Sequence, residues 1–168
     1  MSDFDAFFEA NYAPIVRSLT AAFGNEAAVD EAVQDAFIRA YARWRRVGGY
    51  DVPAAWVRRV AINRLHDGRR ATDRRERAEQ AAWQQSGTDN SVTRSRAGTM
   101  VDMIETLAPR QRIAMALYYV EDLSVREIAK SMHISEGAVK AHLSQGRANL
   151  AQTTELQVSP PSAEASDA

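Results

Sequence analysis

The chain has 168 residues, of which 45% are hydrophobic and 26% are charged, and its formal net charge is −1. This length suits one domain or two small helical ones, the composition excludes a disordered chain, and the absence of cysteine excludes disulfides, thiolate metal sites and a cysteine nucleophile. Because no apolar run approaches the roughly 20 residues that span a bilayer and the N-terminus is not signal-like, we expect a soluble cytoplasmic protein without membrane insertion.

The N-terminal quarter of the chain has helical periodicity. Apolar residues recur at steps of three and four over residues 4–23, which predicts an amphipathic helix or a helix pair in which Pro14 opens the second helix. Gly24-Asn25 interrupts the pattern, and it resumes over residues 28–44. Residues 1–41 carry a net charge of −5. Acidic residues and an amide recur at helical spacing over residues 30–37. This acidic face is either a solvated helix surface or the docking surface for a basic protein partner.

A glycine-containing turn at residues 47–53 precedes a helix predicted over residues 53–70. Its apolar residues occupy one side, and its polar residues occupy the other at spacings i, i+4, i+7 and i+11, with Asp67 nearby: Arg59, Asn63, His66 and Arg70. Residues 42–77 contain eleven arginines and have a net charge of +7, which favours a polyanionic partner. Tyr50 and Trp56 lie close enough to stack on an unpaired base or to pack in the core.

The apolar spacing fades after residue 71 and returns at residue 100, and a Ser-Pro-Pro sequence follows at residue 159. We therefore predict an all-α fold made of two small helical domains, residues 1–71 and 100–153. A polar flexible linker, residues 72–99, joins them, and residues 154–168 form a disordered tail.

The C-terminal domain has the pattern of a helix-turn-helix. Ser124 and Glu127 form a capping box, Ser135 caps a second helix, and Ala129 is small where the two helices cross. A helical hairpin with a solvated polar face is the alternative. At 100° per residue the second helix turns five residues outward, Gly137, Lys140, Ala141, Ser144 and Gln145, and places Glu136 and Arg147 at the margin of that face. His133 stands where many such turns have glycine, which predicts a strained or variant turn.

Three segments now resemble one family. Residues 33–41 (VQDAFIRAY) and residues 55–64 (AWVRRVAINR) are similar to region 2 of the extracytoplasmic-function, or group IV, sigma factors of the sigma-70 family. Residues 107–112 (LAPRQR) followed by residues 123–143 are similar to their region 4. The resemblance covers residues 4–71 and 100–150, in the family's order and at its separation.

The resemblance implies a protein that binds core RNA polymerase, through its β′ clamp helices and β flap, and directs it to promoter DNA. Residues implied to dock the polymerase are Asp30, Glu31, Gln34, Asp35 and Phe37. Those implied to melt and read the −10 element are Tyr50, Arg59, Asn63, His66, Asp67 and Arg70. The outward helix face described above would read the −35 element, and an anti-sigma factor would be a further partner. Family members often carry Arg at the positions of His142 and Gln145, which implies either fewer phosphate contacts or a different base preference at the −35 element here.

Two other classes of function remain to be compared. A response-regulator-type transcription factor would share the helix-turn-helix and bind DNA without polymerase, but the N-terminal half has no parallel-sheet pattern. An enzyme is not predicted, because His66, His133 and His142 are scattered and no P-loop, metal-binding or nucleophile motif is present. We predict no metal site and no cofactor.

Overall fold

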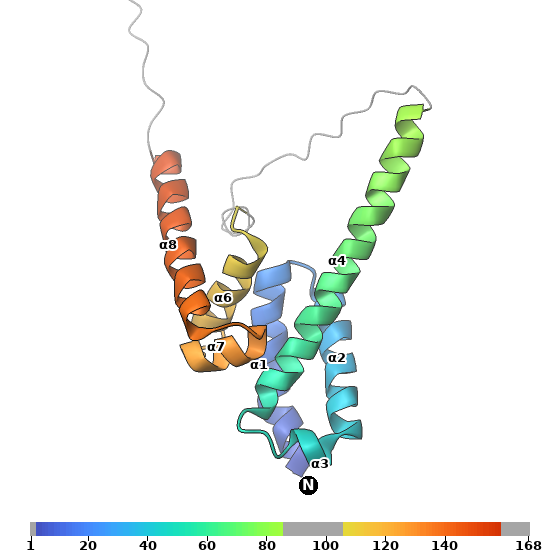
Figure 1. The fold of residues 1–168 in the computed structure, drawn as a ribbon, viewed down its shortest axis with the longest axis vertical. Helices are drawn as coiled ribbons and strands as arrows, with labels where there is room; N and C mark the ends of the chain where they lie inside the picture. The colour runs from blue at the N-terminus through green and yellow to red at the C-terminus, as the bar shows by residue number, and fades with distance from the viewer. Residues whose placement is uncertain (1–2, 86–105, 159–168) are drawn as a thin grey trace, which may run out of the picture.

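The computed structural model describes residues 3–85 and 106–158, and every regular element in these two ranges is an α-helix (Figure 1). This confirms the all-α class. α1 (Asp3–Phe23) is one continuous helix with Pro14 inside it, so the apolar spacing over residues 4–23 belongs to a single helix. Gly24, with φ of 74°, follows α1, and the Asn25 side chain caps α2 (Glu26–Ala42) by accepting from the Ala28 backbone N–H at 3.0 Å.

An aromatic cluster joins the ends of α1, α2 and the short helix α3 (Trp44–Val47). The rings of Phe7 and Trp44 have centroids 4.8 Å apart, and the Phe8 ring meets Phe37 edge-on at 5.0 Å. Such offset and edge-to-face pairs add to the stabilisation from apolar burial. The cluster anchors the beginning of α1 against α2.

α4 (Pro53–Gln85) is much longer than the sequence predicts. We expected it to end near Arg70, but it continues through the first fourteen residues of the predicted linker. Its last core residue is Leu65, which is 7% exposed, and residues 69–82 are all exposed. The apolar period stopped because the side chains of this part of the helix are exposed, so the loss of period did not mark a helix end. The rest of the predicted linker, residues 86–99, lies outside the described residues.

The C-terminal part contains α6 (Pro109–Tyr119), α7 (Val125–Met132) and α8 (Glu136–Val158). The predicted capping box is present, because the Ser124 hydroxyl accepts from the Glu127 backbone N–H and the Glu127 carboxylate accepts from the Ser124 backbone. Ser135 caps α8 through the Ala138 backbone N–H at 3.1 Å. α8 runs to Val158, so residues 154–158 of the predicted tail are helical. Residues 100–105 and 159–168 lie outside the described part of the chain.

The two helical parts, residues 3–85 and residues 106–158, pack against each other; we call them the N-terminal and C-terminal modules. α1 lies between α2 and α6, and α7 packs against α4 (Figure 1). The buried apolar residues form one cluster that includes Leu19 and Val57 of the first module and Leu117 and Ile128 of the second. The surfaces predicted to act in function therefore sit on one packed body.

Candidate nucleic-acid and polymerase interfaces

The acidic face of α2 is held by contacts with its neighbours. Asp30 accepts hydrogen bonds from the Tyr12 hydroxyl and from Gln34 Nε2, the latter at 2.7 Å. Burial, together with the hydrogen bond to Asp30, raises the pKa of Tyr12. Arg64 of α4 donates to Glu31 at 2.7 Å and lies 3.5 Å from Asp35. These contacts order the face while leaving Glu31 and Gln34 exposed.

Phe37 does not share this surface. Its side chain is 2% exposed and packs in the aromatic cluster, so the structure gives it a core position instead of the docking position implied above. Two large apolar side chains that our sequence analysis did not select lie on the exposed side: Ile38 is 67% exposed and Tyr41 is 66% exposed. Their spacing of four and seven residues from Gln34, which places them on its helix face, is the signal that could have found them.

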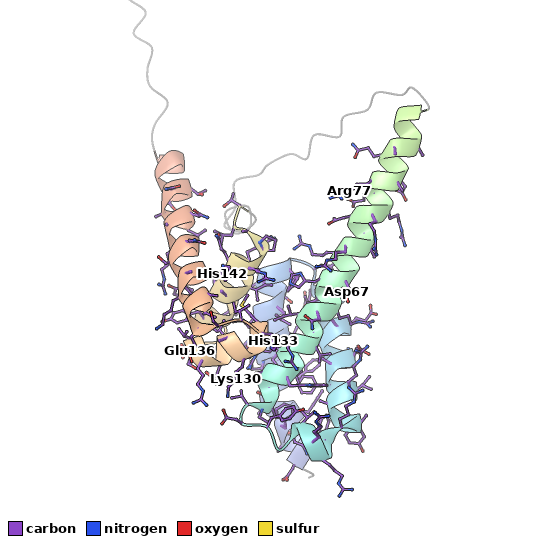
Figure 2. The ribbon with its side chains drawn as sticks, viewed as in Figure 1. Asp67, Arg77, Lys130, His133, Glu136 and His142 are labelled. Atoms are coloured by element: carbon purple, nitrogen blue, oxygen red, sulfur yellow. The ribbon has the colours of Figure 1, made fainter. Side chains whose placement is uncertain are left out.

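The residues predicted to act on the −10 element divide between two grooves. Tyr50 and Arg59 line one, together with Trp56 and with Lys130 and His133 of the C-terminal module. Asn63 and Asp67 line the other, between α4 and α2. Figure 2 shows Asp67 on α4, and it shows Lys130 and His133 on α7 and at its end, where α7 packs against α4.

Arg70 and His66 differ in their surroundings although both belong to the predicted face. Arg70 is exposed on α4. The His66 ring is half-buried and meets the Phe23 ring edge-on at a centroid distance of 5.5 Å. Burial, together with Arg70, Arg69 and Arg110, lowers the pKa of His66, so the ring is neutral at pH 7. His66 is therefore packed against the Phe23 ring of α1, while Arg70 remains exposed on the same predicted face.

The outward face of α8 agrees with the prediction at every position. The buried side of the helix contains Val139 and Leu143, at 0% and 3% exposure. Gly146 is also buried, and a Cβ there would lie 2.9 Å from Cγ of Met115, so the glycine allows α6 and α8 to approach closely. The predicted residues are all exposed: Glu136, Lys140, Ala141, Ser144, Gln145 and Arg147.

Two of these side chains are positioned by α6. Arg147 Nε donates to the Tyr119 hydroxyl at 2.7 Å, and its guanidinium lies 5.5 Å from the centroid of the Tyr118 ring. The hydrogen bond to Tyr119 raises the pKa of Arg147. Gln145 accepts from Gln111 at 3.3 Å. Tyr118, Tyr119 and Gln111 were missed by the sequence analysis, because only the fold brings α6 alongside α8.

The turn before α8 is unusual for its residue type. His133 has φ of 55° and ψ of 47°, in the left-handed region where glycine is favoured, which confirms the predicted strain. Its Nδ1 lies 3.4 Å from Nη1 of Arg59. The helix-turn-helix therefore touches the N-terminal module at its own turn.

A buried ion pair joins the two modules. Arg58 of α4 donates through Nε and Nη2 to Glu121, which follows α6, and the Ser18 hydroxyl of α1 donates to the same carboxylate at 2.8 Å. The Arg58 and Glu121 side chains are only 5% and 4% exposed. A second, exposed contact pairs Asp51 with Arg126 at 3.0 Å and with Lys130.

The described residues show neither a metal centre nor a membrane span. Within residues 3–85 and 106–158, no three His, Asp or Glu side chains gather in a way that could hold a metal ion. No helix in the same ranges has the length and apolar character needed to cross a membrane.

Comparisons with known proteins point in one direction. Residues 7–75 match the family described as Sigma-70 region 2, and residues 98–150 match that described as Sigma-70, region 4. The chain is 26% identical over 153 residues to the RNA polymerase sigma-E factor of Streptomyces avermitilis, covering 91% of this chain and 86% of that protein. It is 28% identical over 145 residues to the ECF RNA polymerase sigma factor SigL of Mycobacterium tuberculosis, covering 82% and 81%.

Two solved structures share the fold. The sigma factor RpoE of Bartonella quintana, crystallised with the anti-sigma factor NepR, matches with a TM-score of 0.66 at 17% identity, over 93% of this chain and 99% of that one. CnrH, in complex with the cytosolic domain of CnrY, matches with a TM-score of 0.61 at 23% identity, over 91% and 88%. At these identities the likeness concerns the fold alone.

Proposed function

The chain belongs to the extracytoplasmic-function sigma factors of the sigma-70 family, and from that premise we propose which of its surfaces perform each step of transcription initiation. Its function is to direct core RNA polymerase to promoters, with the helix-turn-helix recognising the −35 element and region 2 opening the −10 element. The response-regulator alternative is not favoured, because residues 7–75 match region 2. The proposal assigns the protein no reaction of its own and places it in the cytoplasm with the polymerase.

The exposed face of α8 is the observation that carries the −35 assignment. A capped helix with Val139 and Leu143 buried leaves Lys140, Ala141 and Ser144 free to enter a major groove, which admits one α-helix. Lys140 and Ser144 suit base edges or phosphates, and Arg147, anchored by Tyr119, suits a phosphate at the groove margin. Gln145 is exposed, and its hydrogen bond from Gln111 orients its side-chain amide, which can contact a base.

The −10 assignment rests on the face of α4 and the turn before it. Opening a base pair and extruding a base costs a few kcal/mol, which stacking and backbone contacts must offset. The groove between Tyr50, Trp56 and Arg59 offers aromatic faces and a cation. Asn63 and Asp67, exposed one to two turns further along α4, supply the polar groups that can recognise base edges.

The packed modules must separate on a promoter. α7 contacts the turn and Arg59, so it covers part of the proposed −10 surface. The −35 and −10 elements are about 25 base pairs apart, or roughly 85 Å of duplex at 3.4 Å per step. Even α4, with 33 residues, spans only about 50 Å. The structure therefore represents a closed state, and promoter binding requires an open one.

The exposed side of α2 is the surface we assign to the polymerase β′ clamp helices. It combines the carboxylates of Glu31 and Asp35 with Gln34 and with the exposed apolar Ile38 and Tyr41, a mixture typical of protein interfaces. The β flap would bind the C-terminal module. One structural neighbour was crystallised with the anti-sigma factor NepR, and the other was solved in complex with the cytosolic domain of CnrY, which supports an anti-sigma factor as a partner here as well.

The test is transcription by sigma-free core RNA polymerase supplemented with the purified protein on a randomised promoter library. We expect protein-dependent transcripts that share two upstream elements. Protein-independent transcription, or binding to a palindromic duplex without polymerase, would contradict the proposal.

Three variants separate the proposed steps. Gln34→Ala should weaken binding to core polymerase, Asn63→Ala should retain that binding but lose promoter opening, and Lys140→Ala should retain both but lose dependence on the −35 sequence. Arg17→Ala, at an exposed position of α1 outside these surfaces, is the matched control and should behave as wild type. Uniform loss of all three activities in every variant would indicate unfolding, which circular dichroism would detect.

A further inference from the structure

Three side-chain amides form a hydrogen-bonded chain at the edge of the α8 face that we assign to the −35 element. Asn149 of α8 donates through Nδ2 to Oε1 of Gln111 of α6 at 3.1 Å, and Gln111 donates through Nε2 to Oε1 of Gln145 at 3.3 Å. Asn149 lies one turn after Gln145, so both contact α6, which packs alongside α8 (Figure 1). We call Asn149, Gln111 and Gln145 the amide chain.

The amide chain has a direction, because each side-chain amide has an oxygen that accepts and an NH2 group that donates. Asn149 donates to the oxygen of Gln111, which turns the NH2 group of Gln111 toward Gln145. Gln145 receives this hydrogen bond on its oxygen, so its own NH2 group is the end directed away from Gln111. The fold therefore presents Gln145 to an external partner as a hydrogen-bond donor.

Gln145 lies where a donor can meet a base edge. It is exposed one turn after Ala141 on the outward face of α8, whereas Gln111 is half-buried against the side of that helix. A helix in the major groove directs the side chains of its exposed face at base edges. Water leaves this face when the helix enters the groove, and hydrogen bonds within the amide chain are then stronger.

The major-groove edges of the bases differ in what they offer to a donor. Guanine presents two acceptors, N7 and O6, whereas cytosine presents only the donor group at N4. Adenine is best recognised by a glutamine that uses both its NH2 group and its oxygen. Because the oxygen of Gln145 already accepts from Gln111, a Gln145 held in this way favours guanine.

We propose that Gln111 and Asn149 determine which base Gln145 recognises at one position of the −35 element, by holding Gln145 as a donor that selects guanine. The inference rests on the proposed function, because it specifies the −35 assignment of α8. Gln145 contacts the base, whereas Gln111 and Asn149 are positioning residues that act through it. The selected base depends on the direction of the amide chain, so reversing that direction should change the base.

Asn149→Asp reverses the amide chain. A carboxylate only accepts, so Gln111 must turn its NH2 group toward position 149 and its oxygen toward Gln145. Gln145 then donates to Gln111 and directs its own oxygen at the DNA, where it accepts from N4 of cytosine or N6 of adenine. We expect wild-type holoenzyme to select guanine about tenfold at one −35 position of the randomised promoter library, and Asn149→Asp to select cytosine or adenine at that same position.

Two substitutions on α6 test the same inference independently of α8. Gln111→Glu places a carboxylate in the middle of the amide chain, where it accepts from both neighbours, so it should also replace guanine with cytosine or adenine. Gln111→Met removes the link without adding a charge. It frees both ends of the Gln145 amide, and the preference should shift toward adenine. Both results are read by sequencing the transcripts from the library.

Two further variants serve as controls. Gln145→Ala identifies the position, because the preference for guanine should be lost there and nowhere else. Gln152→Glu is the matched control for Asn149→Asp, since it makes the same change from amide to carboxylate at an exposed position of α8 outside the amide chain. Its added charge should weaken binding to all promoters equally and leave every base preference unchanged.

Several outcomes would overturn the inference. If Asn149→Asp and Gln111→Glu weaken binding to all promoters but still select guanine, the amide chain does not set the base. If Gln145→Ala alters no position, Gln145 contacts no base. If Gln152→Glu changes the base in the same way, charge alone is responsible. Any of these results with a wild type that supports promoter-specific transcription leaves the proposed function standing. If wild type directs no transcription, both fail.

Discussion

Two ionic contacts hold the modules together, and they differ in burial. Arg58 and Glu121 are almost completely buried and receive a third partner in Ser18. Asp51, Arg126 and Lys130 form a contact whose members are one-third to two-thirds exposed. Water and salt screen the second contact but hardly reach the first. The number of ion pairs across the interface is therefore a poor measure of its stability, because one buried pair can decide whether the modules stay together.

For the buried pair, losing one charged partner costs much more free energy than losing both. Removing one partner leaves an uncompensated buried charge, whereas replacing both with apolar side chains of similar size is often neutral or stabilising. An unpaired charge inside a single core has no access to water. At this interface the modules can separate, and water then hydrates the unpaired Arg58 or Glu121 side chain. The pair therefore acts on the equilibrium between closed and open states, which the proposed function requires.

The largest effect is expected for Arg58→Met, which leaves Glu121 buried without its cation. Breaking such a pair costs about 3–5 kcal/mol, and separation of the modules limits the loss to the free energy of docking. We expect small-angle scattering to show a larger radius of gyration for this variant than for wild type.

Arg58→Met/Glu121→Met is the matched control, because it removes both charges and keeps apolar contact. It should restore the smaller radius of gyration. An unchanged radius in the single variant, with cooperative unfolding at the wild-type urea midpoint, would mean that Arg58–Glu121 does not determine the closed state.

The second prediction separates local stability from contact between the modules. Ser124→Ala removes the capping box of α7, and loss of a Ser cap costs about 1 kcal/mol. It also removes the hydrogen bond from the Ser124 hydroxyl that lowers the pKa of Glu127, while the backbone N–H of residue 124 still donates to that carboxylate. We expect a lower urea midpoint for the C-terminal module with the radius of gyration unchanged. Opening of the modules by Ser124→Ala would show that α7 transmits local strain to the interface.

The sequence predicted those features that repeat within a helix. The capping box, the Ser135 cap and the buried and exposed faces of α8 all follow from spacings of three or four residues. The strained His133 follows from its place in a turn where glycine is common. The contact between Arg58 and Glu121 joins residues 63 positions apart, and no local pattern indicates it. The extension of α4 was missed because its side chains are exposed through residue 82, and an exposed helix has no apolar period to indicate it.

Phe37 shows how two sequence signals can conflict. Its place in the apolar stripe of residues 28–44 predicts burial, and the family resemblance implied a docking role. The structure follows the apolar period, with the ring enclosed by aromatic neighbours. Tyr41 and Ile38, exposed on the same helix, are better placed to meet a partner.

A smaller effect, of the opposite sign, is expected for His133→Gly. A left-handed conformation disfavours a residue with a Cβ by about 1–2 kcal/mol, and glycine offsets part of this gain through its freer unfolded chain. We expect the free energy of unfolding of the C-terminal module to rise by roughly 0.5 kcal/mol in urea titrations. His133→Ala keeps the Cβ and serves as the control. If His133→Gly enlarges the radius of gyration instead, the contact with Arg59 holds the modules together.

The smallest effect is expected at the exposed contact. The hydrogen bond and charge of Lys130, with Arg126, lower the pKa of Asp51. A carboxyl whose folded pKa lies below its unfolded value of about 3.9 stabilises the closed state above that value, and the contribution is lost as the pH falls through the folded pKa. Asp51→Asn should therefore leave the radius of gyration at pH 7 nearly unchanged, and any difference from wild type should vanish in about 1 M salt, where the Debye length is about 3 Å. A difference that persists in high salt would show that the contact is protected from solvent, and the contrast with Arg58–Glu121 would then lose its basis.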